Sequence, residues 1–329
     1  LTMSRFCLLF LSFLSVLCAL KVMTLNIFGN GDYQVTDYLR KTAIQIRNLN
    51  PDIVTLQETG KSENRLKSVL TYLGKDWSAV ENCNGEIAVI TKHKILSLYE
   101  HVSRGMNARI QLNSGLEISV WAMFLDERKY GPYNKEIKDS NSANAYEASR
   151  IKDIVELIKH PEFVKQIQNS DNIPVIVAGT FNTPSHRDWT VSTKGFNVEW
   201  PVTKVLESAT GMIDSYRELY PDAKTNPGYT WSVYKHTDYD VVAPKDRIDY
   251  IFYRGSLRTV QSRTYSGTST IIPGDAWKNN EWPSDHWAVI TDFEPTWQKH
   301  ENKPSFFVAS EFSNGPFKAI EKCPLKIIA

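Results

Sequence analysis

The stretch VIVAGTFNTPSHRDWT, residues 175–190, decides the fold that we expect for this chain. Its first four residues are apolar and predict a buried strand, which breaks at Gly179. Polar residues follow at once, among them Thr180 and Asn182. A buried strand that ends in polar side chains delivers them to the edge of a sheet, where ligand sites form.

The same pattern recurs in other parts of the chain. Apolar runs with polar residues at or near one end are KVMTLNIFG (21–29), IVTLQE (53–58), DRIDYIFYRG (246–255) and HWAVITDFE (286–294). The polar residues are Asn26, Glu58, Asn182, Asp249 and the pair Asp285–His286. Because strand ends at one edge of a sheet converge in space, we expect these distant residues to share one site.

Each of these residues also has an ordinary explanation when taken singly. Glu58 could be a charge at a helix start, Asp249 could pair with Arg247 or another base, and SDH (284–286) could be a turn with a cap. Their ordered occurrence along the chain favours a site. Carboxylate and amide oxygens suit Mg²⁺, Mn²⁺ or Ca²⁺ rather than zinc. The sequence has no HExxH motif and no paired CxxC motif that would support a zinc site.

The order of predicted elements indicates the fold class. The chain opens with strand, helix, strand and helix, and strand-like segments dominate the middle up to residue 125. We expect a polar loop over 126–145, a helix over 146–159 and a loop-rich section over 183–245. This alternation predicts an α/β (α+β) protein, a four-layer sandwich of two mixed β-sheets packed face to face with helices outside.

The first twenty residues differ from the rest of the chain. Arg5 precedes FCLLFLSFLSVLCA, an apolar run of signal-peptide length that is too short for a comfortable membrane span. We expect residues 1–20 to be a secretory signal peptide, which makes the protein secreted. The alternatives are a membrane anchor or a misassigned start, since Met3 is the better initiator.

Charge argues against a nucleic-acid partner. Removing the leader takes Arg5 from the 38 basic residues and leaves 37 against 37 acidic residues. Proteins that bind nucleic-acid phosphates usually carry a basic excess. We expect a monomer with no transmembrane helix in the mature chain.

Two cysteines and the C-terminal segment leave open questions. Cys83 and Cys323 would remain after the leader is removed, and they could form one disulfide or stay as separate thiols. Residues 299–329 are unlike the rest of the chain. We therefore expect one domain over residues 21–298 and a C-terminal extension of unknown structure over 299–329.

Taken together, these motifs resemble the endonuclease/exonuclease/phosphatase superfamily, also called the DNase I-like superfamily. The matching pieces are MTLNI (23–27), DIVTLQE (52–58), MFLD (123–126), GTFN (179–182), DRIDYIF (246–252) and SDHWAV (284–289). TPSHRDWT (183–190) and residues 214–232 further resemble a secreted-type branch. The resemblance spans residues 21–294 and implies metal-dependent hydrolysis of a phosphate ester.

The resemblance also implies a role for each site residue. Glu58 would hold the divalent metal, with Asn26 beside it and Asp285 contributing, and the metal would polarise a phosphoryl oxygen. Asn182 would orient the phosphate or the attacking water. Asp249 would complete the phosphate and metal surroundings. His286, paired with an acid, would contact the phosphate and stabilise its developing charge.

Two positions depart from the family pattern. The family motif is Gly-Asp-Phe-Asn, but this chain has Thr180 at the position of the water-activating Asp. A second family motif is Thr-His-Leu-Asp, and here this chain has Phe124 at the position of the His. General-base assistance contributes roughly 10²–10⁴-fold to a rate. Asp126 and Asp188 are the nearest acids that could substitute for the missing one, although nothing in their spacing favours this.

The sequence therefore supports two functions. The first is a secreted, Mg²⁺-type (or Mn²⁺- or Ca²⁺-type) phosphoesterase with impaired or altered catalysis. The second is a catalytically inactive pseudoenzyme that uses the same cleft as a secreted module to bind a phosphorylated ligand or a protein. Retention of the six site residues favours the first, whereas Thr180 and Phe124 favour the second.

Overall fold

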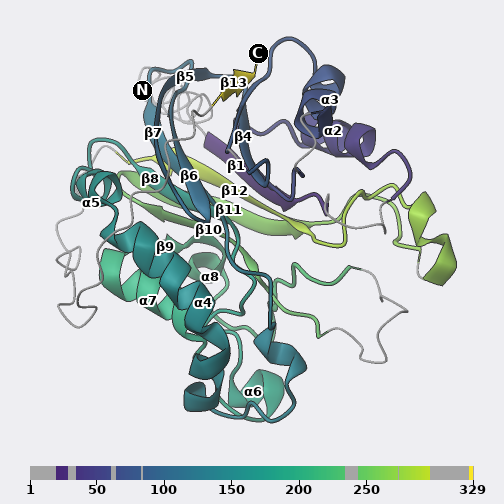
Figure 1. Cartoon of the computed structure of the whole chain (residues 1–329), viewed down its shortest axis with the longest axis vertical. Helices are drawn as coiled ribbons and strands as arrows, with labels where there is room; N and C mark the ends of the chain where they lie inside the picture. Colours follow the sequence, from purple (N-terminus) through teal and green to yellow (C-terminus); the bar gives the residue numbers. More distant parts are fainter. Residues whose placement is uncertain are drawn as a thin grey trace, which may run out of the picture.

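The computed structural model describes residues 20–28, 35–60, 64–82, 84–233, 244–272, 274–296 and 326–328. Two mixed β-sheets pack face to face, with helices on the outer faces (Figure 1). The predicted four-layer sandwich is therefore confirmed.

Among the described residues, the first sheet has seven strands. In spatial order they are β11 (Leu257–Tyr265), β12 (Ala288–Pro295), β1 (Leu20–Asn26), β2 (Ile53–Gln57), β4 (Ile87–Thr91), β3 (Ser78–Glu81) and β13 (Lys326–Ile328). β1 and β2 are parallel and the other neighbours are antiparallel.

The second sheet has six strands in the described part of the chain. In spatial order they are β5 (Lys94–Val102), β6 (Gly105–Gln111), β7 (Glu117–Phe124), β8 (Val175–Thr180), β10 (Asp249–Arg254) and β9 (Ile213–Asp214). β7 and β8 are parallel, so each sheet contains one central parallel pair among antiparallel neighbours.

Helices cover the outer face of each sheet (Figure 1). Next to the first sheet lie α2 (Tyr38–Leu49) and α3 (Asn64–Leu73). Next to the second sheet lie α4 (Ser140–Lys159), α5 (Pro161–Gln168) and α7 (Pro201–Thr210). The remaining short helices are η1 (Gly131–Tyr133), α6 (Val191–Lys194), α8 (Ser215–Leu219) and η2 (Gly274–Asn279).

Alternation of side chains along each strand produces the layers. In β1, Val22 enters the core between the two sheets, whereas Met23 and Leu25 enter the core beneath α2 and α3. In β8, Ile176 faces the inner core and Val177 faces α4, α5 and α7. Both faces of these strands are buried, which is why they read as continuous apolar runs rather than alternating ones.

Three elements differ from the sequence prediction. α4 begins at Ser140 rather than near residue 146, because the Asp139 side chain accepts a hydrogen bond from the Ser142 N–H and caps the helix inside the expected loop. The section predicted as loop-rich contains α7, which starts with Pro201 in its first turn. β11 was not predicted, because its exposed face is polar and it contains a register shift after Thr259.

Part of the C-terminal segment joins the sheet. β13 pairs with β3 through the register Lys326↔Glu81. Residues 1–19 of the predicted signal peptide, Cys83, Cys323 and most of the C-terminal segment lie outside the described residues, whereas Leu20, the last residue of the predicted signal peptide, begins β1. No helix within the described ranges is long and apolar enough to cross a membrane.

Gly179 allows the opening stretch to approach its neighbour closely. Its φ is +150°, and a Cβ at this position would lie 2.0 Å from the backbone oxygen of Met123 on β7. Only glycine fits this contact without moving the backbone of β7. The contact places Thr180, the last residue of β8, directly beside Phe124, the last residue of β7.

Candidate active site

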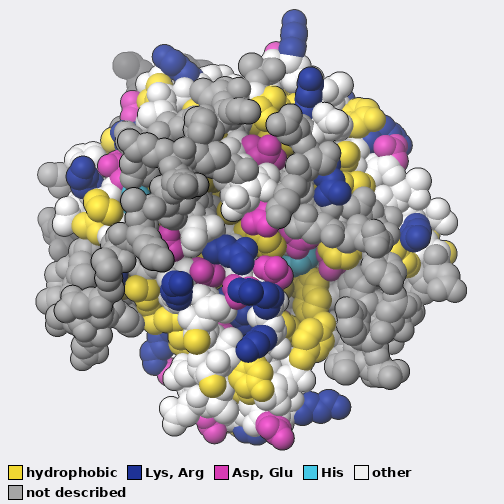
Figure 2. All heavy atoms as spheres, in the orientation of Figure 1, with side chains coloured by type: hydrophobic (Ala, Val, Ile, Leu, Met, Phe, Trp, Pro, Cys, Tyr) yellow, Lys and Arg dark blue, Asp and Glu magenta, His cyan; other side chains and the backbone are white. Residues whose placement is uncertain are grey.

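The ends of four strands bring the predicted site residues together. Asn26 at the end of β1 pairs with Gln57 at the end of β2, and Thr180 at the end of β8 pairs with Asp249 at the start of β10. The two sheets meet here, since Oγ1 of Thr180 lies 3.4 Å from Oε1 of Gln57. In the middle of the face seen in Figure 2, Lys, Arg, Asp and Glu side chains gather around a histidine.

Asn26 and Glu58 form the first contact of the site. Nδ2 of Asn26 donates a hydrogen bond to Oε1 of Glu58 at 2.9 Å, while its Oδ1 accepts from the Phe28 N–H at 2.8 Å. Glu58 has a φ of +58°, which is unusual for a residue with a side chain. Such conformations cluster at functional sites, because the surrounding structure has to hold them in place.

Ser284 connects this pair to the next part of the site. Its hydroxyl donates to the backbone oxygen of Asn26 at 2.5 Å and accepts from the His286 N–H at 3.0 Å. The loop that carries Asp285 and His286 is therefore fastened directly to the end of β1. Ser284 lies in the SDHWAV motif, but its role depends on this contact between distant segments.

Asp249 and His286 form a buried pair. Nδ1 of His286 lies 2.9 Å from Oδ2 of Asp249, and both residues are almost completely buried. Asp249 does not pair with Arg247, because Arg247 binds Asp188 and Asp214 instead. Of the ordinary partners considered for Asp249, Arg247 is therefore wrong, and the other base that pairs with Asp249 is His286.

The acids around His286 control its charge. Burial by itself lowers the pKa of His286, but the carboxylates of Asp249, Asp285 and Glu58 outweigh this effect and raise the pKa to about 9. In the protein without a metal, His286 is therefore a cation near neutral pH. The influence of Glu58 also shows that its carboxylate lies close enough to act on the His286 ring.

Asp285 lies on the other side of the His286 ring. Its Oδ1 is 4.0 Å from Nε2 of His286, and its Oδ2 accepts a hydrogen bond from the indole N–H of Trp231 at 3.0 Å. The ring of Trp231 lies edge-on to those of Tyr130 and Tyr133, with centroids 5.3 and 6.0 Å away. An aromatic surface thus borders the acidic part of the site.

Asp246 holds this aromatic surface in place. The Tyr130 hydroxyl donates to Oδ2 of Asp246 at 2.9 Å, and the Trp189 indole donates to Oδ1 at 2.8 Å. The backbone of Asp246 also exchanges hydrogen bonds with that of Trp231. Burial raises the pKa of Asp246, although Lys194 and these donors oppose the rise. The sequence around Asp246 carries no signal for this role, because its partners Tyr130, Trp189 and Trp231 lie far away along the chain.

Thr180 lies at the centre of the site. Its hydroxyl donates a hydrogen bond to Oδ1 of Asp249 at 2.6 Å, and the side chain is completely buried. Phe124, the other departure from the family pattern, packs into the apolar core between the sheets and is 2% exposed. At this position the core therefore extends to the border of the site.

Asn182 lies on the loop just after β8. It has a φ of +54°, and its Nδ2 donates to the backbone oxygen of Leu125 at 2.9 Å. This bond fastens the loop to the end of β7 and leaves the amide oxygen and one amide N–H of Asn182 for other partners.

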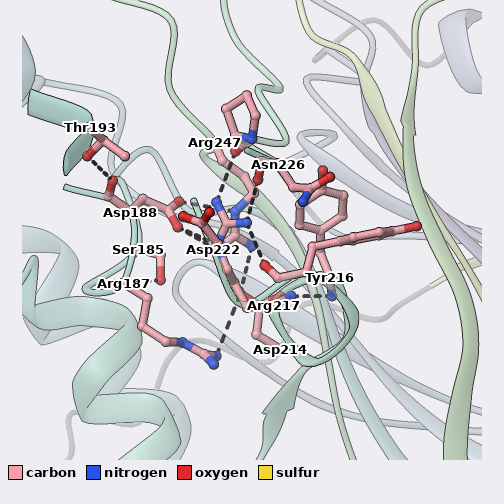
Figure 3. Close-up of polar contacts among 12 residues, drawn as sticks. Ser185, Arg187, Asp188, Thr193, Asp214, Tyr216, Arg217, Asp222, Asn226 and Arg247 are labelled. Carbon is pink, nitrogen blue, oxygen red and sulfur yellow. Dashed lines mark hydrogen bonds and ion pairs between the residues drawn. The ribbon is translucent and has the colours of Figure 1, made fainter. Parts of the chain in front are cut away.

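Neither candidate acid replaces the one missing at position 180. The Asp188 carboxylate is bound by both Arg217 and Arg247, as Figure 3 shows, at 2.8 and 3.1 Å. Asp126 is held by two hydrogen bonds from the Arg128 guanidinium. Burial acts to raise the pKa of Asp126, but Arg128 holds it well below its usual range. Both acids are structural partners of arginines.

The buried arginines also fix the loops around the site. Arg217 donates to the backbone oxygens of Tyr220, Asn226 and Pro227, and Arg247 joins it to Asp188 and Asp214 (Figure 3). These contacts hold the segment that leads to Thr230 and Trp231. The Thr230 hydroxyl accepts hydrogen bonds from the backbone N–H groups of Ile248 and Asp249, which places Asp249 in the site.

The oxygen donors of the site fit a magnesium-type ion better than zinc. Mg²⁺ is usually bound through one or two carboxylates plus substrate and water, whereas structural zinc needs several His or Cys ligands. Glu58, Asp285 and the amide oxygen of Asn26 offer such a set. In the described ranges, no group of three or more His, Cys, Asp or Glu side chains is placed to hold a metal by itself.

Comparisons with known proteins agree with this architecture. A family model described as Endonuclease/Exonuclease/phosphatase family matches residues 142–286. A Caenorhabditis elegans protein, "Uncharacterized protein F14F9.5", is 34% identical over 289 residues, which cover 83% of this chain and 91% of that protein.

Solved structures with low sequence identity share the fold. Truncated TDP2 from Caenorhabditis elegans is 16% identical with a TM-score of 0.58, and covers 84% of this chain and 98% of that structure. The catalytic domain of human Nocturnin, solved with a bound sulfate anion, is 19% identical with a TM-score of 0.54. The match covers 85% of this chain and 94% of that structure. The chain is therefore a relative of the F14F9.5 protein, its residues 142–286 match the endonuclease/exonuclease/phosphatase family, and it shares the fold of these solved structures.

Proposed function

We propose that this chain is a divalent-metal-dependent phosphoesterase of the phosphodiester-hydrolase type, with catalysis altered by the threonine at position 180. The observation that carries the proposal is the meeting of the Asn26–Glu58 contact with the buried Asp249–His286 pair at one edge of the two sheets. Carboxylates that can hold a metal ion and a histidine cation suit hydrolysis of a phosphate ester, because the ion and the cation both stabilise the negative charge that develops on the phosphoryl oxygens.

Glu58, Asn26 and Asp285 would hold the ion, which we propose to be Mg²⁺, with Mn²⁺ and Ca²⁺ as alternatives. A bound ion of this type acts as a Lewis acid on a phosphoryl oxygen. The Asn26 amide already binds Glu58, which keeps the carboxylate of Glu58 in one orientation. The Trp231 indole does the same for Asp285.

The other residues would act on the phosphate and the leaving group. His286 donates its Nδ1 proton to Asp249, so its Nε2 is the nitrogen that remains for the substrate. As a cation it would stabilise charge on the phosphate or give a proton to the departing oxygen. Asn182 would orient the phosphate or the attacking water through the part of its amide that Leu125 leaves available.

The alternative function is a catalytically inactive binding protein that uses the same cleft. Two observations favour it. The Thr180 hydroxyl is engaged by Asp249 and cannot serve as a base near neutral pH, and Phe124 is buried in the core. Neither observation affects the residues proposed to hold the ion, so such a protein would still bind a divalent metal and a phosphorylated ligand.

The enzymatic function is tested by turnover of bis(4-nitrophenyl) phosphate, an activated phosphodiester, with Mg²⁺ or Mn²⁺. Glu58→Gln removes the main proposed metal ligand, and Glu117→Gln, paired with Arg109 on β6, is the matched control. We expect metal-dependent turnover that falls at least about 100-fold in Glu58→Gln and is unchanged in the control. Turnover of the unmodified chain no higher than that of Glu58→Gln would leave the binding function as the correct one.

We also propose that the protein is secreted, monomeric and acts on a phosphate ester other than nucleic acid. The apolar N-terminal run after Arg5 supports secretion, as does the resemblance of residues 183–190 and 214–232 to a secreted-type branch. The balanced charge of the mature chain supports a substrate without a long phosphate backbone.

A further inference from the structure

We propose that Thr180 is a positioning residue for the Asp249–His286 pair. This inference rests on the proposed function, because the pair acts on a phosphate only if the site is catalytic. The Thr180 hydroxyl lies 2.6 Å from Oδ1 of Asp249, and Oδ2 of Asp249 lies 2.9 Å from Nδ1 of His286. The three residues therefore form one continuous chain of hydrogen bonds that ends at the ring facing the site.

The donor and acceptor in each of these hydrogen bonds follow from the number of protons that each side chain can donate. A threonine hydroxyl has one proton to donate, and the short contact to a carboxylate directs that proton to Asp249 rather than to Oε1 of Gln57, 3.4 Å away. Because one carboxylate oxygen is held by Thr180, the other is directed at Nδ1 of His286. The imidazole is thereby kept in the orientation that leaves Nε2 for the substrate.

Burial makes the hydroxyl necessary. Asp249 is 1% exposed, so water cannot replace a lost donor at its Oδ1. Thr180 and Asp249 lie directly opposite each other in the antiparallel register of β8 and β10. The β-branched side chain of threonine has few χ1 rotamers on a strand, so the strand pairing sets the position of the hydroxyl.

The test uses the full mature chain with three substitutions. Thr180→Val removes the hydroxyl at nearly constant shape, and Thr180→Ser keeps it. Thr42→Val is the matched control, because Thr42 is a completely buried threonine on α2 whose hydroxyl has no hydrogen-bond partner among the described residues. The measurements are kcat and KM for bis(4-nitrophenyl) phosphate, and the NMR signals of the His286 ring in the metal-free protein.

We expect Thr180→Val to lower kcat by roughly 10-fold to 100-fold with KM changed less than about 2-fold, since an orienting partner acts on the reacting group rather than on binding. Thr180→Ser should recover kcat to within a few fold, and the Nδ1–H resonance of His286 should shift in Thr180→Val but not in Thr42→Val. If Thr180→Val keeps both kcat and the His286 resonances, the proposal is overturned.

Two further outcomes are also decisive. Equal losses of kcat and thermal stability in Thr180→Val and Thr180→Ser would show a packing role and overturn the proposal. If the unmodified chain lacks metal-dependent turnover, the phosphoesterase function fails, but the His286 resonances still decide whether Thr180 positions the pair. Should Thr180→Val fail to fold, Thr180→Ser decides whether Thr180 positions the pair. We expect its kcat and His286 resonances to resemble those of the unmodified chain.

Discussion

The indole N–H of Trp231 donates a hydrogen bond to Oδ2 of Asp285 at 3.0 Å, and the Trp231 ring lies 6.4 Å from the ring of His286. A loop far from SDHWAV in the sequence thus supplies the partner that orients one of the proposed metal ligands. The buried acid Asp246 holds that loop through the backbone of Trp231. The orientation of Asp285, which we propose as a metal ligand, therefore depends on residues outside the SDHWAV motif.

Substitution of Trp231 tests whether its hydrogen bond to Asp285 matters for metal binding. Trp231→Phe keeps an aromatic ring but removes the donor to Asp285. We expect the affinity for Mg²⁺, measured by isothermal titration calorimetry, to fall by roughly 10-fold, because partners of metal ligands typically matter at this level. Trp77→Phe, in the core beneath α3, is the control. Equal affinities of Trp231→Phe and the unmodified chain would contradict the expectation.

The Asp249–His286 pair should make stability depend on pH. The pKa of His286 is raised to about 9, so its contribution to stability is fully present below its unfolded value of about 6.5 and is lost as pH rises through 9. Removing one member of a buried pair costs about 3 kcal/mol. We expect Asp249→Asn to lower the free energy of unfolding by about this amount at pH 6 and by clearly less at pH 10. Urea denaturation of the metal-free protein measures both, and an equal loss at the two pH values would refute the assignment.

Glu207 should produce a second pH effect, away from the site. Burial raises its pKa to about 7, and the 2.7 Å ion pair with Arg187 opposes but does not cancel this rise. The group therefore stabilises the fold below about pH 4.5, and this contribution is lost as pH rises through 7.

Glu207→Gln removes the titrating group. We expect the difference in free energy of unfolding, Glu207→Gln minus the unmodified chain, to rise by up to about 3 kcal/mol from pH 5 to pH 8. Urea denaturation at the two pH values measures the difference. Glu294→Gln, paired with Arg258 on the sheet surface, is the control and should show no such trend. A constant difference for Glu207→Gln would mean that Arg187 keeps the carboxylate ionised throughout.

The pairing of β3 with β13 leads to a prediction about the two cysteines. Glu81 pairs with Lys326. Cys83 follows Glu81 by two residues and Cys323 precedes Lys326 by three, and both cysteines lie outside the described residues. Because Glu81 and Lys326 are paired and we propose that the protein is secreted, we expect a Cys83–Cys323 disulfide.

Mass spectrometry of peptides from the unreduced protein should find the two cysteines linked. Cys83→Ser should release a free thiol at Cys323 and lower the free energy of unfolding by about 2–4 kcal/mol, which is typical for loss of a disulfide. Complete alkylation of both thiols without a reducing agent would show that they are separate.

Several features of the fold could be predicted from short stretches alone. The apolar runs that end at Asn26, Glu58 and Thr180 predicted buried strands with a shared edge, and the structure has these strands. Exposed and edge elements were harder, as β11 shows: its solvent face is polar, so no period-2 apolar signal marks it. α4 was predicted too short because its cap at Asp139 lies within a polar segment that looks like a loop.

The sequence by itself determined the buried strands, the first two helices and the six candidate site residues, because burial and strand ends leave a local pattern of apolar and polar side chains. Only the tertiary structure decided which residues touch. In the structure, Asp249 pairs with His286 rather than with Arg247. Asp188 binds Arg217 and Arg247, and the Thr180 hydroxyl donates to Asp249. These contacts join residues 29 to 69 positions apart, and the register of strands and the packing of two sheets set them, which no local pattern records.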